Sequence, residues 1–207
     1  MSTTVEVFAE ITCPFAYVGL QHVIDHVAEL DDPPRVIVRA WPLEWVNGTG
    51  LAFDGVETKA AALRKQLGID AFNGLQESAW PATTIPALAL ASAAYGIDAP
   101  TGLAVSTDLR TAVFELGVDI SDPVVLHEIA SAHGVGFDAH DTEAHGRAVR
   151  VDYDQGQGRG VKGSPHYFVS DDNFFCPALD LGRDADDHLI ARFDPDGLAR
   201  FLARVEL

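Results

Sequence analysis

The stretch Ile11-Thr12-Cys13-Pro14-Phe15-Ala16-Tyr17 decides the fold, because it joins an apolar run to a helical pattern. The run from Val5 to Ile11 predicts a buried strand. Residues 14–30 carry apolar side chains at helical spacing, and Pro14 lies in the first turn, where proline is tolerated. Cys13 therefore precedes a helix, whose unpaired amides and positive dipole end favour the reactive thiolate. We expect Cys13 to be a reactive nucleophile.

Charge and composition exclude several classes of function. The chain has 207 residues and a formal net charge of −17, from 31 acidic and 14 basic residues. Such a chain repels phosphate backbones and anionic lipid, so we expect no nucleic-acid partner and no membrane partner. No run approaches the length of a membrane span, and residues 1–6 lack the pattern of a secretory signal. We therefore expect a cytoplasmic protein with reduced cysteines.

The middle of the chain has a different pattern from its ends. A second strand is predicted from Arg35 to Trp41, after Pro33-Pro34 ends the first helix. From about residue 55 to 157 the pattern is helical, and a glycine follows most of the predicted helices. The predicted helices span residues 56–67, 84–95, 101–116, 121–133 and 141–153.

Strands return after residue 160. The runs Pro165 to Val169 and Asn173 to Leu179 flank the turn 170–172 and predict a hairpin, in which Tyr167 would pair with Cys176. A final helix is predicted from Asp196 to Arg204. This order predicts an α/β core that carries an all-helical insertion. Residues 1–54 and 158–207 would form the core domain, and residues 55–157 the insertion domain.

Three stretches together resemble the DsbA-like branch of the thioredoxin superfamily. Residues 12–19, Thr-Cys-Pro-Phe-Ala-Tyr-Val-Gly, are similar to its Cys-Pro-x-Cys-Tyr-x-Gly motif. Residues 160–165, Gly-Val-Lys-Gly-Ser-Pro, resemble its Gly-Val-x-Gly-x-Pro loop, and residues 114–123 resemble a stretch frequent in its insertion. The resemblance implies a thioredoxin-like core sheet with a large all-helical insertion. It also implies that the Ser164-Pro165 bond is cis and packs beside Cys13.

Two departures from the family pattern bear on the mechanism. Ala16 stands where the motif has its second, resolving cysteine, and Val7 stands where the family has a buried acid that serves that cysteine. Glu10 lies three residues before Cys13, and it resembles the acidic residue that cytosolic members of the branch carry at that position. A lone cysteine can attack a disulfide, but an external thiol must then resolve the mixed disulfide. The resemblance thus implies a thiol-disulfide oxidoreductase with glutathione or mycothiol as cosubstrate and no tightly bound cofactor.

The two motifs supply the candidate site. Cys13 is the candidate catalytic residue. His166 is placed either to stabilise a thiolate or to point away from it. The histidines match no closed set of ligands, so we expect no metal site. The candidate substrate-binding residues are Pro14, Phe15, Ala16, Tyr17, Ser164, Pro165 and His166.

Alternatives to this function remain open. The kappa-class glutathione transferases and the chromene-carboxylate isomerases resemble this architecture and bind a small thiol without redox cycling, but they usually carry serine at the position of Cys13. A binding protein that has lost catalysis is a third option, in which Cys13 is buried and inert. Cys176 lies two strands away, about 10 Å, too far for a disulfide with Cys13. We expect a small thiol or disulfide as partner, and a homodimer is one option for assembly.

Overall fold

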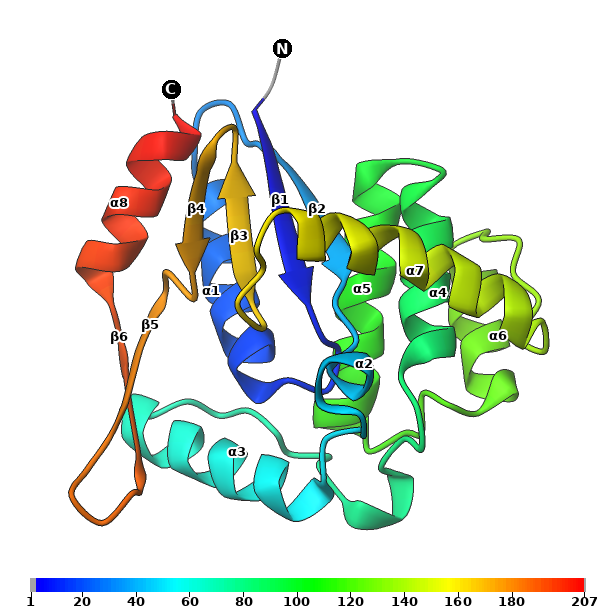
Figure 1. Ribbon diagram of the computed structural model, residues 1–207, viewed down its shortest axis with the longest axis horizontal. Helices are drawn as coiled ribbons and strands as arrows, with labels where there is room; N and C mark the ends of the chain where they lie inside the picture. Colours follow the sequence, from blue (N-terminus) through cyan, green and yellow to red (C-terminus); the bar gives the residue numbers. More distant parts are fainter. Residues whose placement is uncertain (1–2, 207) are drawn as a thin grey trace.

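The computed structural model describes residues 3–206, and its centre is a four-stranded sheet in the order β2-β1-β3-β4 (Figure 1). Strand β1 (Thr4–Ala9) pairs in parallel with β2 (Arg35–Ala40), and helix α1 (Pro14–Ala28) connects them. Strands β3 (His166–Val169) and β4 (Asp172–Phe175) complete the sheet with antiparallel pairing. The predicted thioredoxin-like α/β core is confirmed.

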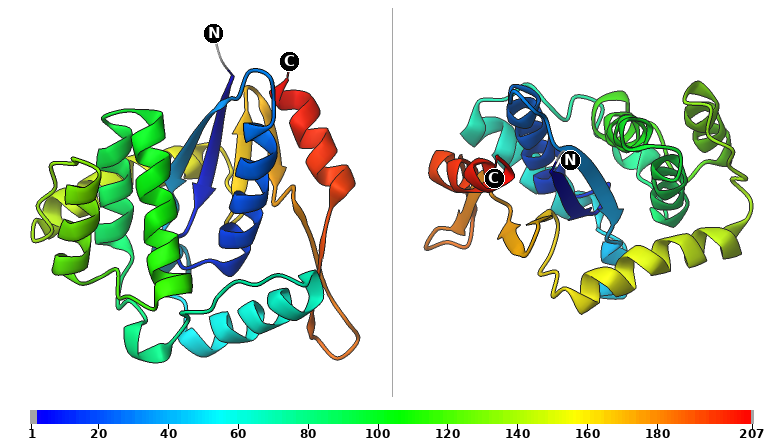
Figure 2. Two further views of the ribbon diagram at one scale, coloured as in Figure 1. Left: turned by 180° about the vertical axis from the view of Figure 1, so that it is seen from behind. Right: turned by 90° about the horizontal axis from the view of Figure 1, so that it is seen from above.

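Alternation along the strands gives the sheet two apolar faces. Val5 and Val7 of β1 pack with helix α1 and with the C-terminal helix α8 (Pro195–Val205) on one face. Phe8 of β1 points to the other face, where it packs with Tyr153 of helix α7 (Thr142–Gly158). The views from behind and above show α1 and α7 on opposite sides of the sheet (Figure 2).

The segment between β2 and β3 is helical, as predicted. It contains α2 (Leu43–Asn47), α3 (Phe53–Leu67), α4 (Ile85–Tyr95), α5 (Ala99–Thr111), α6 (Pro123–Ala132) and α7, with a 3₁₀ turn, η1 (Glu77–Ala79), and a π-helical turn, η2 (Ala112–Leu116). Helix α3 packs against β6 (Leu189–Phe193) and α1, apart from the group formed by α4 to α7 (Figure 1). The division into domains at residues 55 and 158 stays a prediction.

Two predictions about the C-terminal strands are wrong. The strand expected from Asn173 to Leu179 breaks at Cys176, which has a left-handed backbone with φ of 49°. The chain then forms β5 (Leu179–Arg183), which pairs with β6 in a second, two-stranded sheet that the sequence analysis missed. The hairpin register also differs, because the turn is shorter: Tyr167 pairs with Phe174.

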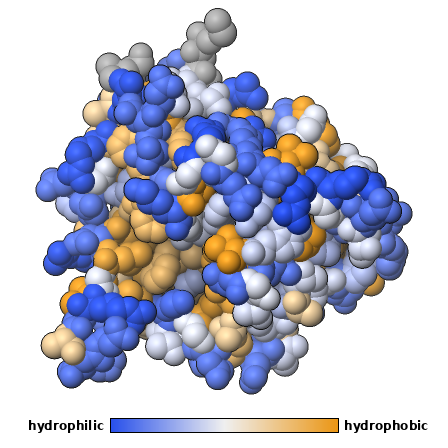
Figure 3. Space-filling view, viewed as in Figure 1, coloured by the Kyte–Doolittle hydropathy of each residue, from blue (hydrophilic) through white to orange (hydrophobic). Residues whose placement is uncertain are grey.

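On the face seen in Figure 1, apolar surface gathers between the β5–β6 hairpin and α3 (Figure 3).

Helix α7 lies close to the sheet. A Cβ atom at Gly156 would lie 2.6 Å from the Trp41 ring and 2.9 Å from the Phe8 ring, so glycine is required for this approach. Helix α7 also runs to Gly158, five residues further than predicted. Its last turns therefore cover the sheet beside the loop that leads to β3.

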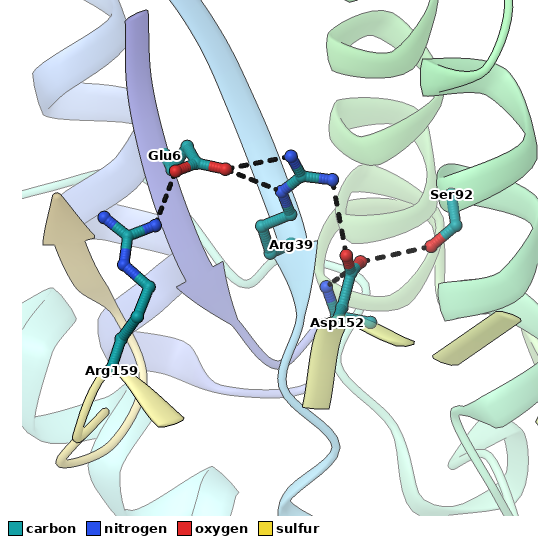
Figure 4. Close-up of polar contacts among 6 residues, drawn as sticks. Glu6, Arg39, Ser92, Asp152 and Arg159 are labelled. Atoms are coloured by element: carbon teal, nitrogen blue, oxygen red, sulfur yellow. Dashed lines mark hydrogen bonds and ion pairs between the residues drawn. The ribbon is translucent and has the colours of Figure 1, made fainter. Parts of the chain in front are cut away.

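A polar network joins α7 to the edge of the sheet (Figure 4). Glu6 of β1 accepts hydrogen bonds from Arg39 of β2, at 2.9 and 3.0 Å, and from Arg159, which follows α7. Arg39 also donates to Asp152 of α7 at 3.3 Å, and Asp152 accepts the Ala40 amide at 2.9 Å. Burial acts to raise the pKa of Glu6, but the hydrogen bonds from both arginines outweigh it and hold that pKa below its ordinary value.

We predict that Glu6→Gln lowers the free energy of unfolding at neutral pH by about 1–3 kcal/mol, because it removes charge-assisted bonds to two arginines. The lowered pKa of Glu6 in the folded state means that this contribution is present above pH 4.5, its ordinary pKa, and is lost as the pH falls through the folded-state value. Urea denaturation of both proteins between pH 7 and about pH 3 measures this. A gap between the two proteins that stays constant over this range contradicts the prediction.

Candidate functional site

Cys13 occupies the N-cap position of α1, with extended backbone angles, φ −82° and ψ 115°. Pro14 opens the helix, where its missing amide costs nothing. The carbonyl of Cys13 accepts the Tyr17 amide at 3.0 Å, the first bond of the helix. The amides of Phe15 and Ala16 face the sulfur and act to lower its pKa. The predicted position of the thiol at the start of the helix is confirmed.

The loop before β3 lies against Cys13, and its Ser164-Pro165 bond is cis, as the resemblance implies. The Cys13 thiol donates a hydrogen bond to the Ser164 carbonyl, with Sγ and O 3.2 Å apart. The Ser164 hydroxyl accepts the Glu10 amide at 2.9 Å. Ser164 therefore links the loop both to the thiol and to the end of β1.

The expectation of a thiolate at Cys13 is not met in this structure. Cys13 is only 4% exposed, and burial raises the pKa of its thiol. The amides of Ala16 and Phe15 lower the pKa, as the helix position predicts, but their effect is smaller than that of burial. The nearby Glu10 carboxyl raises the pKa further. Burial therefore favours the protonated thiol, which is the form that donates to the Ser164 carbonyl.

Glu10 anchors the segments around the thiol. One carboxyl oxygen accepts the amides of Ile11 and Thr12, at 2.7 and 3.3 Å. The other accepts the Leu43 amide at 2.9 Å and the Thr84 hydroxyl at 3.1 Å. Burial raises the pKa of Glu10, and these four bonds offset part of that effect. The carboxyl group therefore joins the loop before Cys13 to the starts of α2 and α4.

Arg110 of α5 is a buried cation that the sequence analysis missed. Its side chain donates to the carbonyl and hydroxyl of Ser106, at 2.8 and 2.6 Å, and to the Glu10 carbonyl at 3.5 Å. Its Nε has no partner among the described residues. Burial lowers the pKa of Arg110, while nearby Glu10 and Cys13 act to raise it. No sequence signal reveals this residue, because it continues the pattern of an ordinary amphipathic helix.

The structure does not bring the His166 ring to the thiol. One ring nitrogen of His166 accepts the Lys162 amide at 3.1 Å, and the other lies 3.1 Å from the Asn173 side-chain oxygen. Burial lowers the pKa of His166. A neutral ring with both nitrogens engaged holds the loop before β3 rather than contacting Cys13.

Tyr17 also points away from the thiol. Its hydroxyl donates to Glu115 at 2.8 Å, and its ring stacks on Phe114 with centroids 4.8 Å apart. Burial and the Glu115 carboxyl raise the pKa of Tyr17. The site that the structure brings together is thus Cys13, the amides of Phe15 and Ala16, and Ser164 with Pro165.

Cys176 directly follows β4, and both cysteines are free. Its amide donates to the Pro165 carbonyl at 3.1 Å, so it follows the strand partner of His166. Burial raises the pKa of Cys176 to about 12, with a further contribution from Cys13. Cys176 is therefore a protonated, buried thiol beside the loop before β3.

One group of possible metal ligands occurs within residues 3–206, at the tip of the second hairpin. Asp184, Asp186 and His188 are exposed, and Asp184 accepts the amides of the other two at 2.9 Å each. These bonds are those of an ordinary turn. In the same described region, no helix is both long and apolar enough to cross a membrane.

Comparison with known proteins agrees with this geometry. The model of the family described as "DSBA-like thioredoxin domain" matches residues 4–186. No curated protein matches the sequence closely enough to count as a relative. Among solved structures, the cytosolic disulfide reductase DsbM from Pseudomonas aeruginosa is 16% identical, with 97% of each chain covered and a TM-score of 0.61. Its structure with glutathione is 14% identical, covers 99% of this chain and 100% of that chain, and has a TM-score of 0.60.

A 2-hydroxychromene-2-carboxylate isomerase is also similar in structure. It is 15% identical, with 83% of this chain and 88% of that chain covered and a TM-score of 0.60. At such low identities these similarities concern the fold alone.

We predict that alkylation of Cys13 by iodoacetamide, followed in a Cys176→Ala variant, has a higher pH midpoint in the native protein than in the same protein in urea. The reason is that burial raises the pKa, and only the thiolate reacts. The same protein in urea should titrate at about 8.5. A midpoint in the native protein below that of the unfolded protein would mean that the helix amides outweigh burial.

We also predict that Glu10→Gln lowers the free energy of unfolding by about 2–4 kcal/mol. The amide group of glutamine would face donors that now point at a carboxyl oxygen, leaving buried groups without partners. Urea denaturation measures the loss, and Glu57→Gln on the exposed surface of α3 is the matched control. Equal stability of the two variants would show that the four bonds to Glu10 are not required.

Proposed function

Because the chain belongs to the DSBA-like thioredoxin domain family, we propose that it is a thiol-disulfide oxidoreductase that acts through Cys13 alone. The observation that carries the proposal is the position of the thiol, at the amino end of α1 and 3.2 Å from the carbonyl of Ser164, next to Pro165. A disulfide bound against this loop would have Cys13 as its nearest nucleophile. The second thiol of the reaction is an external small thiol, such as glutathione or mycothiol.

The reaction has two exchange steps. The sulfur of Cys13 attacks a substrate disulfide, the substrate S–S bond breaks, and one substrate half leaves as a thiol that takes up the proton of Cys13. The other half stays bound to Cys13 in a mixed disulfide. The external thiol then attacks this mixed disulfide, so that Cys13 regains its proton and the second half leaves joined to the external thiol.

The chain itself offers no resolving thiol for the second step. Ala16 is fully buried at the position where a second cysteine of the motif would be. Cys176 is buried as well, and its backbone is held by the bond to the Pro165 carbonyl. The need for an external thiol supports a cytoplasmic location, where small thiols are abundant and reduced.

Burial limits when Cys13 can react. In the free protein the thiol is protonated and covered, so attack requires that substrate binding uncovers it. Phe15 packs against the apolar cluster that contains Cys13, and its displacement by a substrate would open the way to the sulfur. Once the sulfur is uncovered, the desolvation that raises its pKa is reduced, while the amides of Phe15 and Ala16 remain.

A second candidate function is favoured by the protonated state of Cys13. A thiol that turned its proton from the Ser164 carbonyl to a bound small thiolate would stabilise that thiolate, instead of attacking a disulfide itself. The chain would then be a thiol-dependent isomerase or transferase, and the similarity in fold to 2-hydroxychromene-2-carboxylate isomerase is consistent with this. Serine at position 13 would preserve such a function.

The test separates the two functions. In a Cys176→Ala protein incubated with glutathione disulfide, we expect one glutathione to attach to Cys13, as measured by intact mass, and reduced glutathione to release it. An adduct that forms only in urea would contradict the oxidoreductase proposal. Retention of glutathione binding in Cys13→Ser, measured by calorimetry, together with no native adduct, would favour the second function.

A further inference from the structure

A groove lies between helix α3 and the β5–β6 hairpin, beside the amino end of α1. Its volume is about 870 Å³, and residues that line it include Phe15, Ala62, Leu181 and Leu189. The space-filling view shows apolar surface gathered in this region, with polar residues around it (Figure 3). A groove of this size with an apolar lining is typical of a site for a small organic ligand.

The walls of the groove are held together by Gln66, at the end of α3. Its amide group donates to the Leu189 carbonyl at 2.7 Å, and its side-chain oxygen accepts the Ala191 amide at 2.7 Å. Through these two bonds the side-chain amide of Gln66 pairs with backbone groups of β6 and attaches the strand to α3. The groove is therefore formed before a ligand arrives, which lowers the cost of binding.

The charge of the groove is opposite to that of the protein. Only three lysines occur in this chain of net charge −17, and two of them, Lys59 and Lys65, line the groove. Arg183 also lines it, but that guanidinium is paired with Asp187 at 3.1 Å. Neither lysine forms an ion pair with any residue between 3 and 206. Two ammonium groups without partners beside an apolar lining match a ligand with an apolar body and anionic groups.

Phe15 connects the groove to the thiol. It lines the groove, and it lies two residues after Cys13. It also packs against the apolar cluster that includes Cys13. A ligand in the groove therefore contacts a side chain of the Cys13 motif itself.

We propose that this groove binds the substrate of Cys13, and that the substrate is a small disulfide whose apolar body carries carboxylate or other anionic groups. The inference rests on the proposed oxidoreductase function for the reaction itself. The recognition of an anionic, apolar molecule rests only on the groove, so the two can fail separately.

The first experiment compares two aromatic disulfides that differ in charge. 5,5′-Dithiobis(2-nitrobenzoate) carries two carboxylates, and 4,4′-dithiodipyridine is neutral. Both form a mixed disulfide with Cys13 and release one aromatic thiol, which is followed by absorbance in a Cys176→Ala background. At low salt we expect the ratio of the two rates, anionic to neutral, to be about fivefold lower in Lys59→Gln/Lys65→Gln than in the parent protein. In high salt, which screens the lysines of the parent, we expect this difference to disappear.

The control variant is Arg35→Gln/Arg147→Gln, which changes the net charge by the same amount outside the groove. We expect it to leave the ratio within about twofold of the parent protein. An equal fall of the ratio in both variants, or no fall in either, overturns the groove inference and leaves the proposed function intact.

The second experiment does not depend on the reactivity of Cys13. The anionic aromatic dye 1-anilinonaphthalene-8-sulfonate is titrated into Cys13→Ser protein, and its fluorescence reports binding. We expect the affinity to fall about fivefold when Lys59 and Lys65 are replaced by glutamine, and to be unchanged in the control. This result together with an unreactive Cys13 would contradict the oxidoreductase function but support the groove as a site for anionic, apolar ligands. Equal affinities in all variants would overturn the groove inference.

Discussion

The carboxyl group of Glu10 is the contact on which the arrangement of the site depends. It accepts four hydrogen bonds inside the protein, and their donors come from the loop before Cys13, from the start of α2 and from Thr84 before α4. The Glu10 amide donates to Ser164, so the same residue also reaches the loop before β3. Four segments that are distant in sequence therefore meet at one side chain. A buried group with this many partners is costly to replace, because each donor would lose its acceptor.

Much of the fold follows from local signals in the sequence. Alternating apolar residues in β1, the Pro-Pro pair before β2, and glycines with left-handed backbones at Gly68 and Gly117 mark elements that the structure confirms. The second hairpin was missed because Cys176 adopts a left-handed backbone that no sequence rule assigns to cysteine, so that β4 ends at Phe175 and a separate strand begins at Leu179. The predicted register of the first hairpin is wrong because the turn is shorter than expected, so that Tyr167 pairs with Phe174 instead of Cys176, a shift of two residues.

The candidate site shows where local reasoning is insufficient. The position of Cys13 before α1 was predictable, and so was the loop at Pro165. The ionisation of the thiol was not, because it depends on how many atoms of distant segments cover the sulfur. The amides of Phe15 and Ala16 act in the predicted direction, yet burial outweighs them. Arg110 was equally hidden, since only the folded chain reveals that its guanidinium lies in the interior near Glu10.

The bond from the Cys13 thiol to the Ser164 carbonyl has a consequence for any chemistry at the sulfur. Cys13 has one proton, and that proton is the tether between helix and loop. Loss of the proton would set two electron-rich atoms against each other at about the same separation, and an adduct would remove the donor altogether. Either event therefore removes the hydrogen bond that joins the start of α1 to the loop before β3.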